Sequence, residues 1–472
     1  MKTNKYILVA FAVLAMAACT KLDENGRLDQ EETPTDVQTV SFKAVLGDDS
    51  GDPASKSVIG SNGSGKPQNF WEDGDEITVY SGNGVSASMD GYKFSTTLLA
   101  NSSEADFEYN GGDWTEGTGY IAIYPAATAA RTVNFTGEGD VYKMAAVDVP
   151  QYQTLVAGSF DKAAAVATAY TTGNTFSFKN AVALIKFRVS DSDIKGGSIV
   201  VDNADHISGR FRADLSTTEP YLPTLTVYST NGVTQHNFVE FTIDGSTNLS
   251  TGVDYYVAVR PTALTSGFKV YLNGNLVKSF TSVQVERFAR NKVYNLGTLS
   301  VPGSPAEKQL HFNFQKTPLT GWPTESNRTP AANNIENCVY PLYGVDYTFV
   351  AADCLGATKS QVFWNPSSLV LTLNAGQRYL GFPVIPGYKL TKVVCHNKSG
   401  NTTAKFEVVN CIIQNTSDSP AGDQIVSAAQ TWSTKDIRYV YSLTGTNAST
   451  MYYLYCVKAG SIGYAALTYV PD

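Results

Sequence analysis

Short runs of alternating apolar and polar residues, bounded by glycine or asparagine, recur through most of this chain and constrain its fold more than any other feature. Examples are EITVY at 76–80, YIAIYP at 120–125 and DYYVAV at 254–259. The run GFKVYLNG at 267–274 ends in Asn-Gly, which favours a tight hairpin. Period-two alternation is typical of half-buried strands, and the best helical candidate, residues 161–169, is short. The pattern therefore predicts an all-β chain.

The length of 472 residues predicts more than one domain. VPGSPAEK at 301–308 has two prolines, a glycine and a polar exit, which are typical of a linker. The part before this linker is large for one sandwich, so we expect a further division near residue 172. The predicted organisation is a signal peptide (1–18), a flexible tether (19–35), two β-sandwich subdomains (36–172 and 173–300), a linker (301–308) and a C-terminal, jelly-roll-like β-sandwich (309–472).

The N-terminal segment has the features of an export signal. Lys2 and Lys5 precede an apolar run at residues 6–18, which is shorter than the roughly 20 residues that a membrane-spanning helix needs. The small residues before Cys19 resemble the lipobox of bacterial lipoproteins, which implies a lipid on Cys19 and anchoring in the outer membrane. The following TKLDE resembles the address that exports lipoproteins of the Bacteroidetes to the cell surface. The alternative is an ordinary signal peptide with a chance cysteine.

The charge and the cysteines exclude several classes of function. The formal net charge is −8, and loss of Lys2 and Lys5 with the signal gives −10, which argues against a nucleic-acid partner. The sequence has four histidines and no C-x-x-C, so we expect no zinc site and no cofactor. Cys395, Cys411 and Cys456 lie in strand-like runs and are expected to be small buried hydrophobes. If one disulfide forms, the candidate pair is Cys338 with Cys354.

The stretch FWEDGDEITVY at 70–80 packs four carboxylates into five positions beside Trp71. Same-side residues on a strand lie roughly 6.6 Å apart at about 3.3 Å per residue, a separation near that of inverting glycosidases. Two carboxylates side by side on one strand cannot flank a sugar bond from opposite faces, however. Asp-Gly also favours a type I′ turn. We therefore expect Trp71 in the core and solvated acids around a turn.

Several motifs, taken in order, resemble those of the fimbrillin family of Bacteroidetes surface proteins. WEDGDEITVY is followed by YIAIYPA at 120–126, QYQTLVAGSFD at 151–161 and FSFKNAVALIKFRVS at 176–190, and RNKVYNLGTLS at 290–300 closes the series. The resemblance covers residues 36–300. It implies tandem transthyretin-like β-sandwich subdomains in a surface lipoprotein that acts as a pilus subunit, pilus tip, anchor or related adhesin.

The resemblance also implies a processing step and leaves one part of the chain unexplained. Stalk subunits of the family lose an N-terminal strand by cleavage after a basic residue, and Arg27 or Lys43 could be that residue. The groove that the lost strand leaves then accepts a strand from the next subunit. The last 165 residues lie outside the minimal family pattern and fit a tip or accessory adhesin better than a repeating stalk unit.

Aromatic residues are abundant in the C-terminal part. Flat rings can stack on sugars, and loops carry binding more often than strands do. GWP at 321–323 and VFWNP at 362–366 place Trp322 and Trp364 at loop-like boundaries, and Trp432 is the third candidate for ligand binding; the alternative is that these rings form the sandwich core. No catalytic arrangement is evident, so we expect a binding protein rather than an enzyme. The alternatives left open are an adhesin for a host, bacterial or glycan ligand, a glycan-binding accessory lipoprotein and a structural pilus subunit.

Overall fold

The computed structural model describes residues 39–46, 58–61, 67–82, 91–111, 113–126, 141–202, 204–227, 235–243, 247–315, 319–324, 334–353, 362–374, 378–412 and 420–472. Within these residues the chain forms 35 strands and one short 3-10 helix, η1 (Lys162–Ala164), which Asp161 caps by accepting from the Ala163 N–H. The predicted all-β class is confirmed. The helical candidate at 161–169 contains only η1 and the start of a strand.

The first unit is a closed seven-stranded barrel, named here the N-terminal barrel, in the order β1-β11-β10-β7-β4-β5-β6. The sequence pattern predicts a sandwich here, and the sheet closes because β1 pairs parallel with β11 and antiparallel with β6. Its strands are β1 (Val40–Leu46), β4 (Glu76–Gly82), β5 (Tyr92–Ser95), β6 (Glu104–Tyr109), β7 (Gly119–Tyr124), β10 (Ala167–Thr171) and β11 (Thr175–Asn180), with a separate hairpin of β2 (Val58–Ser61) and β3 (Pro67–Phe70).

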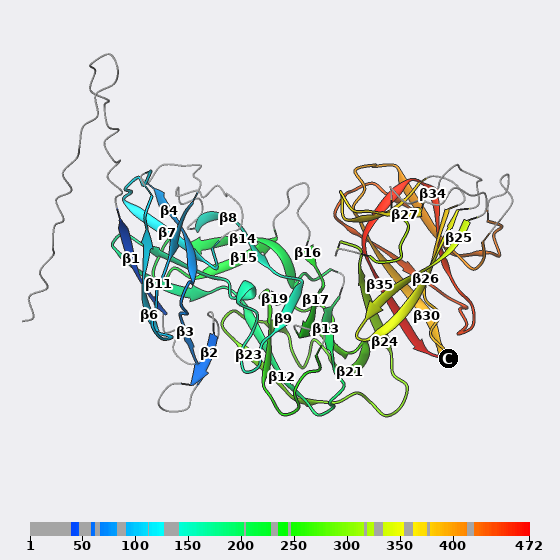
Figure 1. Cartoon of the computed structure of the whole chain (residues 1–472), viewed down its shortest axis with the longest axis horizontal. Helices are drawn as coiled ribbons and strands as arrows, with labels where there is room; N and C mark the ends of the chain where they lie inside the picture. Colours follow the sequence, from blue (N-terminus) through cyan, green and yellow to red (C-terminus); the bar gives the residue numbers. More distant parts are fainter. Residues whose placement is uncertain are drawn as a thin grey trace, which may run out of the picture.

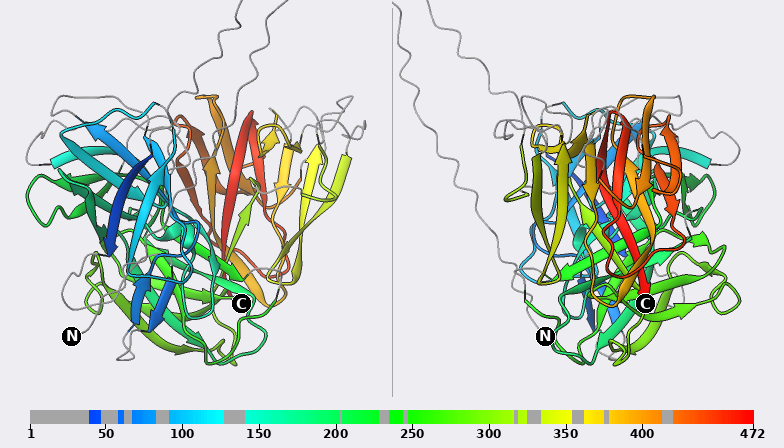
Figure 2. Two further views of the ribbon diagram at one scale, coloured as in Figure 1. Left: turned by 60° about the vertical axis from the view of Figure 1, so that its left-hand side comes forward. Right: turned by 90° about the vertical axis from the view of Figure 1, so that its right-hand side faces the viewer.

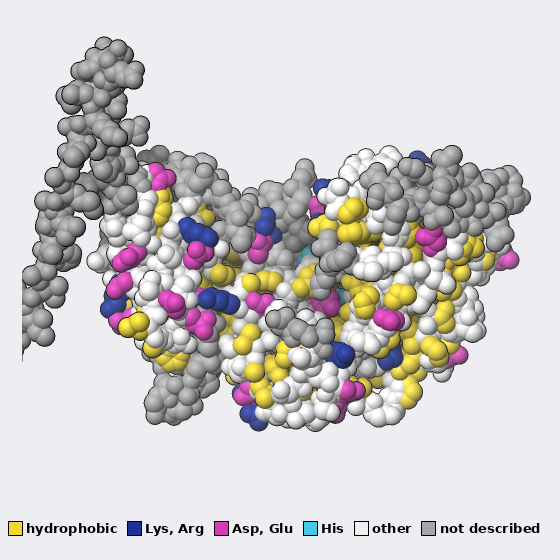
Figure 3. All heavy atoms as spheres, viewed as in Figure 1, with side chains coloured by type: hydrophobic (Ala, Val, Ile, Leu, Met, Phe, Trp, Pro, Cys, Tyr) yellow, Lys and Arg dark blue, Asp and Glu magenta, His cyan; other side chains and the backbone are white. Residues whose placement is uncertain are grey.

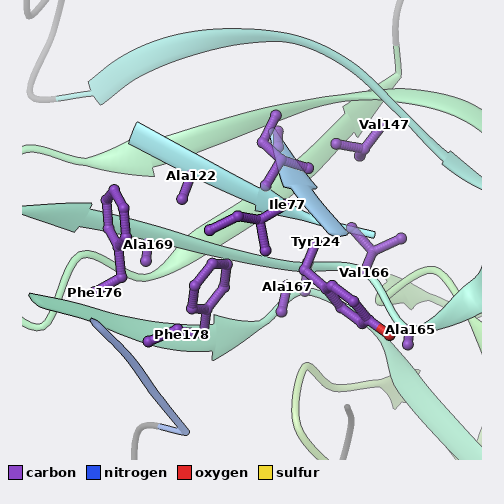
Figure 4. Close-up of a cluster of buried hydrophobic side chains, with 14 of the residues drawn as sticks. Ile77, Ala122, Tyr124, Val147, Ala165, Val166, Ala167, Ala169, Phe176 and Phe178 are labelled. Atoms are coloured by element: carbon purple, nitrogen blue, oxygen red, sulfur yellow. The ribbon is translucent and has the colours of Figure 1, made fainter. Parts of the chain in front are cut away.

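A four-stranded sheet packs against the barrel and shares its core. The strands are β8 (Val141–Val149), β14 (Ser208–Ser216), β15 (Pro223–Val227) and β16 (Gln235–His236). Val147 and Phe211 of this sheet belong to the same buried cluster as Tyr124 and Phe178 of the barrel. Figure 4 shows Val147 above the barrel residues Tyr124, Val166 and Ala122. Barrel and sheet are therefore joined by continuous apolar packing.

The next unit, the middle sandwich, has two facing sheets. One sheet has β12 (Ala183–Val189), β18 (Tyr255–Val259) and β23 (Val293–Leu299), and the other begins with β9 (Tyr152–Leu155), β13 (Gly196–Val201), β17 (Phe238–Ile243), β20 (Phe268–Leu272) and β21 (Asn275–Phe280). A small pair, β19 (Thr262–Ala263) with β22 (Arg287–Phe288), lies beside them. Phe187 from one sheet and Ile199 and Phe241 from the other are buried in the core between them.

The last unit, the C-terminal sandwich, also has two sheets. The first contains β24 (Lys308–Asn313), β27 (Val362–Asn365), β28 (Val370–Leu373), β30 (Tyr388–Asn397), β33 (Arg438–Ser442) and β35 (Gly460–Pro471). The second contains β25 (Asn334–Leu342), β26 (Val345–Asp353), β29 (Arg378–Gly381), β31 (Ala404–Val409), β32 (Ile425–Trp432) and β34 (Tyr453–Lys458). Phe312, Phe349 and Leu467 are buried between them.

The three units follow one another along the longest axis of the molecule (Figure 1). Figure 2 shows the middle sandwich at the base, with the barrel and the C-terminal sandwich rising on either side. The first sheet of the C-terminal sandwich continues the sheet of the middle sandwich, but the pairing between β21 and β24 consists of Asn275 with Lys308. The two sheets are thus joined by a narrow connection.

Strands on the two sides of residue 172, the predicted division of the chain, pair with each other. Residue 172 separates β10 from β11, yet these strands pair with each other in the barrel, and β9 from before this point pairs with β17 of the middle sandwich. The first two units are therefore interleaved in sequence. Residues 301–307, most of the predicted linker, lie between β23 and β24.

The cysteines of the described residues are free thiols. Cys338, half of the candidate disulfide, is buried and free, and Cys354 lies outside the described residues. Cys395 and Cys456 are buried in strands as predicted, whereas Cys411 is half-buried and follows the end of β31. Burial raises the pKa of Cys338 and of Cys456 to about 12, so both stay protonated thiols. In the described part of the chain, no helix combines the length and the apolar character that crossing a membrane would need.

Candidate functional site

The acidic stretch at 70–80 forms the entry to β4. Trp71 is fully buried and packs edge-on against Phe107, Tyr124 and Phe178 at 5.1–5.3 Å, which confirms the expected core position. Gly74 has a φ of 72°, while Asp73 before it does not have a positive φ. A type I′ turn requires positive φ at both central residues, so the predicted turn type is wrong.

Asp75 is the second departure from the expected solvated acids, because its side chain is fully buried. It accepts hydrogen bonds from the Glu72 N–H at 2.8 Å and from the Tyr124 hydroxyl at 3.0 Å, and it lies 2.5 Å from Lys162 Nζ. A buried carboxylate needs such partners to offset its desolvation. Asp75 therefore ties the entry of β4 to β7 and η1, which is a structural role.

The predicted processing residues lie at or before β1. Lys43 is in the middle of β1, where its exposed side chain is 2.5 Å from Glu104 and its neighbours Phe42 and Ala44 are buried. Both edges of β1 are paired, so a protease could not bind Lys43 as an extended segment unless the strand first left the barrel. Arg27 and the predicted lipid site Cys19 lie outside the described residues.

All three candidate tryptophans are in the core of the C-terminal sandwich. Trp322, Trp364 and Trp432 are 2%, 4% and 0% exposed, so the expectation that Trp322 and Trp364 lie at the surface is wrong. Each indole N–H already has a protein acceptor: the Val339 carbonyl, the Phe314 carbonyl and the Tyr441 hydroxyl, at 2.8–2.9 Å. Their rings thus offer no surface for stacking on a sugar.

Nothing in the sequence places the four histidines near one another, but three of them lie close together in the structure. His236, His311 and His396 are buried and meet where the C-terminal sandwich packs on the middle sandwich. The rings of His236 and His396 are 5.6 Å apart, and that of His311 is 4.0 Å from Phe238. Burial lowers the pKa of His311 from 6.5 to about 3, so its ring is neutral at neutral pH. Among the described residues no cluster could hold a metal ion.

Beside these histidines a cleft of about 420 Å³ opens between the two sandwiches. It lies between β13, β20 and β21 on one side and β24, β30 and β35 on the other. Gln309 and His311 of β24 line it, and sequence reasoning missed both. The signal was present in KQLHFN, where these polar residues alternate with the core residues Leu310 and Phe312. Alternation shows that a polar face exists but not what packs on it.

The far end of the C-terminal sandwich has an exposed edge. β25 is the terminal strand of its sheet, and Ile335 and Val339 on it are 47% and 40% exposed. Edge strands with exposed apolar side chains are places where another chain can pair. On the face in Figure 3, acidic and basic side chains of the described residues are interspersed with hydrophobic ones and form no large patch of one sign.

No protein-family model matches the chain, and no curated protein is a match. Among solved structures it is similar to a proposed cell adhesion protein from Bacteroides uniformis (18% identity, 56% of this chain and 94% of that chain, TM-score 0.31). A proposed cell adhesion protein from Bacteroides fragilis matches at 14% identity over 56% of this chain and 95% of that chain, with a TM-score of 0.28. A fimbrial protein from Bacteroides ovatus matches at 10% identity over 62% of this chain and 58% of that chain, with a TM-score of 0.24. At these scores the matches assign neither fold nor function.

Proposed function

We propose that this chain is a cell-surface adhesion protein of fimbrillin type, held at the outer membrane by a lipid on Cys19 and acting as a pilus tip or accessory adhesin. One observation carries the proposal. β1, the first described strand after the tether, lies at one end of the longest axis, and the C-terminal sandwich lies at the other (Figure 1). An anchor on Cys19 would therefore leave the C-terminal sandwich free to contact a partner.

The exposed edge at β25 supports contact with a protein partner at this far end. Ile335 and Val339 are apolar side chains on a strand whose outer edge has no neighbouring strand in the described part of the sheet. Main-chain hydrogen bonds at such an edge give affinity, and alternate side chains give specificity.

Two substitutions test the proposal. In cells that express the full chain, Cys19→Ala should release the protein from the membrane fraction and abolish adhesion to partner cells. Val339→Glu should leave the protein on the surface but weaken adhesion, and Val283→Glu, at a valine that is 95% exposed in the middle sandwich, is the matched control. Membrane retention of the Cys19→Ala chain would contradict the anchor. Equal adhesion by all chains would contradict the adhesive role.

A structural pilus subunit is the second candidate, and the position of β1 favours it. β1 lies between β6 and β11 with Phe42 and Ala44 buried, so its removal would open a groove that a strand from another subunit could fill. Cleavage after Lys43, within β1, should then give ladders that resist SDS, whereas cleavage after Arg27 leaves β1 in the chain and removes only the segment before it. A chain that is trimmed after Lys43 and stays monomeric would exclude this function.

A further inference from the structure

The cleft between the middle and C-terminal sandwiches is lined by sheet faces that point away from both cores. On β24, Leu310 and Phe312 are buried in the C-terminal core, while Gln309 and His311 point the other way and line the cleft. On β20, Val270 belongs to the middle core, while Lys269 and Tyr271 line the cleft. The cleft is thus built by two outer faces of a sheet that bends at the narrow β21–β24 connection.

Gln309 and His311 are buried side chains of the cleft lining whose polar atoms lack a partner in the described protein. Gln309 is 9% exposed, and its amide nitrogen donates to Thr468 Oγ1 at 3.3 Å, but its Oε1 accepts no hydrogen bond. His311 is 3% exposed, and neither of its ring nitrogens has a partner. A buried polar atom left unpaired lowers stability, because the hydrogen bonds that it makes to water are lost and not replaced. These atoms have almost no accessible surface in the free protein, so both residues would be stabilised by a hydrogen-bonding molecule in the cleft once their side chains turn toward it.

The charges that line the cleft cancel. Lys269 lies 2.8 Å from Glu307, which also accepts a hydrogen bond of 2.6 Å from the Tyr271 hydroxyl. Lys392 and Asp202 are the other charged residues of the lining, so the two cations and two anions sum to zero. The neutral ring of His311 adds no charge. This lining favours an uncharged ligand over a polyanion or a polycation.

The lining combines donors, acceptors and an aromatic wall. Ser279 and Ser442 bring hydroxyl groups to the cleft, Gln309 Oε1 is an acceptor, and a neutral imidazole has one nitrogen of each kind. Phe280 lines the cleft and stacks on Phe268 at 4.5 Å. A volume of about 420 Å³ is in the range of small-molecule sites, about 300–1,000 Å³. A ligand that matches has several hydroxyl groups, no charge and apolar C–H faces.

We propose that this cleft binds a neutral saccharide of one or two residues, with a sugar hydroxyl donating to Gln309 Oε1 and another hydrogen-bonding to His311. The cleft closes around the ligand from both sandwiches, so binding also strengthens their junction. The proposal depends on neither the lipid anchor nor adhesion.

The test uses purified full-length mature protein and a panel of neutral mono- and disaccharides built from glucose, galactose, mannose and N-acetylglucosamine. Isothermal titration calorimetry should find at least one that binds, and Gln309→Leu and His311→Phe should each weaken it about tenfold. Both substitutions keep approximate size and remove an unpaired polar atom, and Gln309→Leu also loses the 3.3 Å hydrogen bond to Thr468, so thermal stability should change little. His396→Phe, a buried histidine of the same junction that does not line the cleft, is the matched control and should bind as the parent does.

Three results would overturn the proposal. The first is that no saccharide of the panel binds at concentrations up to about 10 mM. The second is that Gln309→Leu and His311→Phe bind as tightly as the parent protein while folding normally by circular dichroism. The third is that glucuronate or sialic acid binds more tightly than every neutral sugar, which would contradict the charge balance of the lining.

Discussion

Two packing junctions of the molecule, one between the barrel and the four-stranded sheet and one between the middle and C-terminal sandwiches, differ in chemistry. Between the barrel and its neighbouring sheet, apolar side chains such as Tyr124, Val147 and Phe211 form one continuous buried cluster. Between the middle and C-terminal sandwiches, a small cluster that includes Phe238 and Tyr464 is surrounded by buried histidines and other polar groups. The first junction resembles the interior of a domain. The second has buried polar atoms that lack partners, which makes it sensitive to protonation and to a ligand that could pair with them.

The largest loss of stability is expected from a substitution in the apolar core of the barrel. Trp71→Ala should lower the free energy of unfolding of the barrel by about 3–5 kcal/mol, because a fully buried ring that packs on three aromatic neighbours leaves a cavity. Urea unfolding followed by circular dichroism measures this loss. Leu99→Ala, at a fully exposed leucine of the same unit, is the control and should change stability by less than about 0.5 kcal/mol. Equal effects of the two substitutions would contradict the barrel core.

Acid should weaken the junction between the middle and C-terminal sandwiches. Burial, together with the positive charges of Lys398 and Arg438, lowers the pKa of His236 and of His396 well below 6.5, and burial lowers that of His311 to about 3. The folded state therefore binds fewer protons than the unfolded state, so the stabilisation is complete above pH 6.5 and is lost as the pH falls below it. Between about pH 7.5 and 5.5 the junction should lose about 2–4 kcal/mol.

Hydrogen exchange of β24 and β35 amides at the two pH values would measure this loss. His396→Phe keeps a ring stacked on Tyr464 and removes one titrating group, so its loss on acidification should be smaller. An identical loss in the parent and in His396→Phe would show that this histidine does not sense the pH.

A smaller effect is expected from the buried acid of the barrel. Asp75→Ala removes the acceptor of the Glu72 N–H and of the Tyr124 hydroxyl and should cost about 1–3 kcal/mol. Lys162, whose side chain is 44% exposed, can turn to water and limits the loss. Glu76→Gln breaks the exposed pair with Lys93 and should cost less than about 1 kcal/mol in the same urea experiment. If Asp75→Ala lowers the free energy of unfolding no more than Glu76→Gln does, the hydrogen bonds of Asp75 do not stabilise the barrel.

The smallest effect tests the narrow connection between the sandwiches. Lys308 donates a hydrogen bond to Asn275, the residue with which it also pairs across β21 and β24. Asn275→Ala should destabilise the junction by about 0.5–1.5 kcal/mol and speed hydrogen exchange at the start of β24. Exchange in β12, inside the middle sandwich, should not change. Faster exchange in both strands would mean that the connection supports the whole sandwich and not only the junction.

The sequence predicted strands well because strand formation depends on local alternation. Ile77 and Val79, two positions apart in the predicted strand EITVY, are in the barrel core, and Trp71 is in the same core. Prediction from the sequence failed where the burial of a side chain depends on a partner far away in the chain. Trp364 lies two residues before Pro366 and so resembles a loop residue, yet Thr324 forms a bridge to it and the Phe314 carbonyl accepts its indole N–H. Asp75 is buried because Lys162, 87 positions later, approaches it.

The candidate site illustrates the same division. From the sequence alone came the all-β class, the expected lipid site at Cys19 and the low content of histidine. Only the tertiary structure brought His236, His311 and His396 together and placed Gln309 beside a cleft. The physical reason is that side-chain alternation fixes which residues share a face of a strand. The face that this strand meets is decided by pairing and packing between segments far apart in the chain.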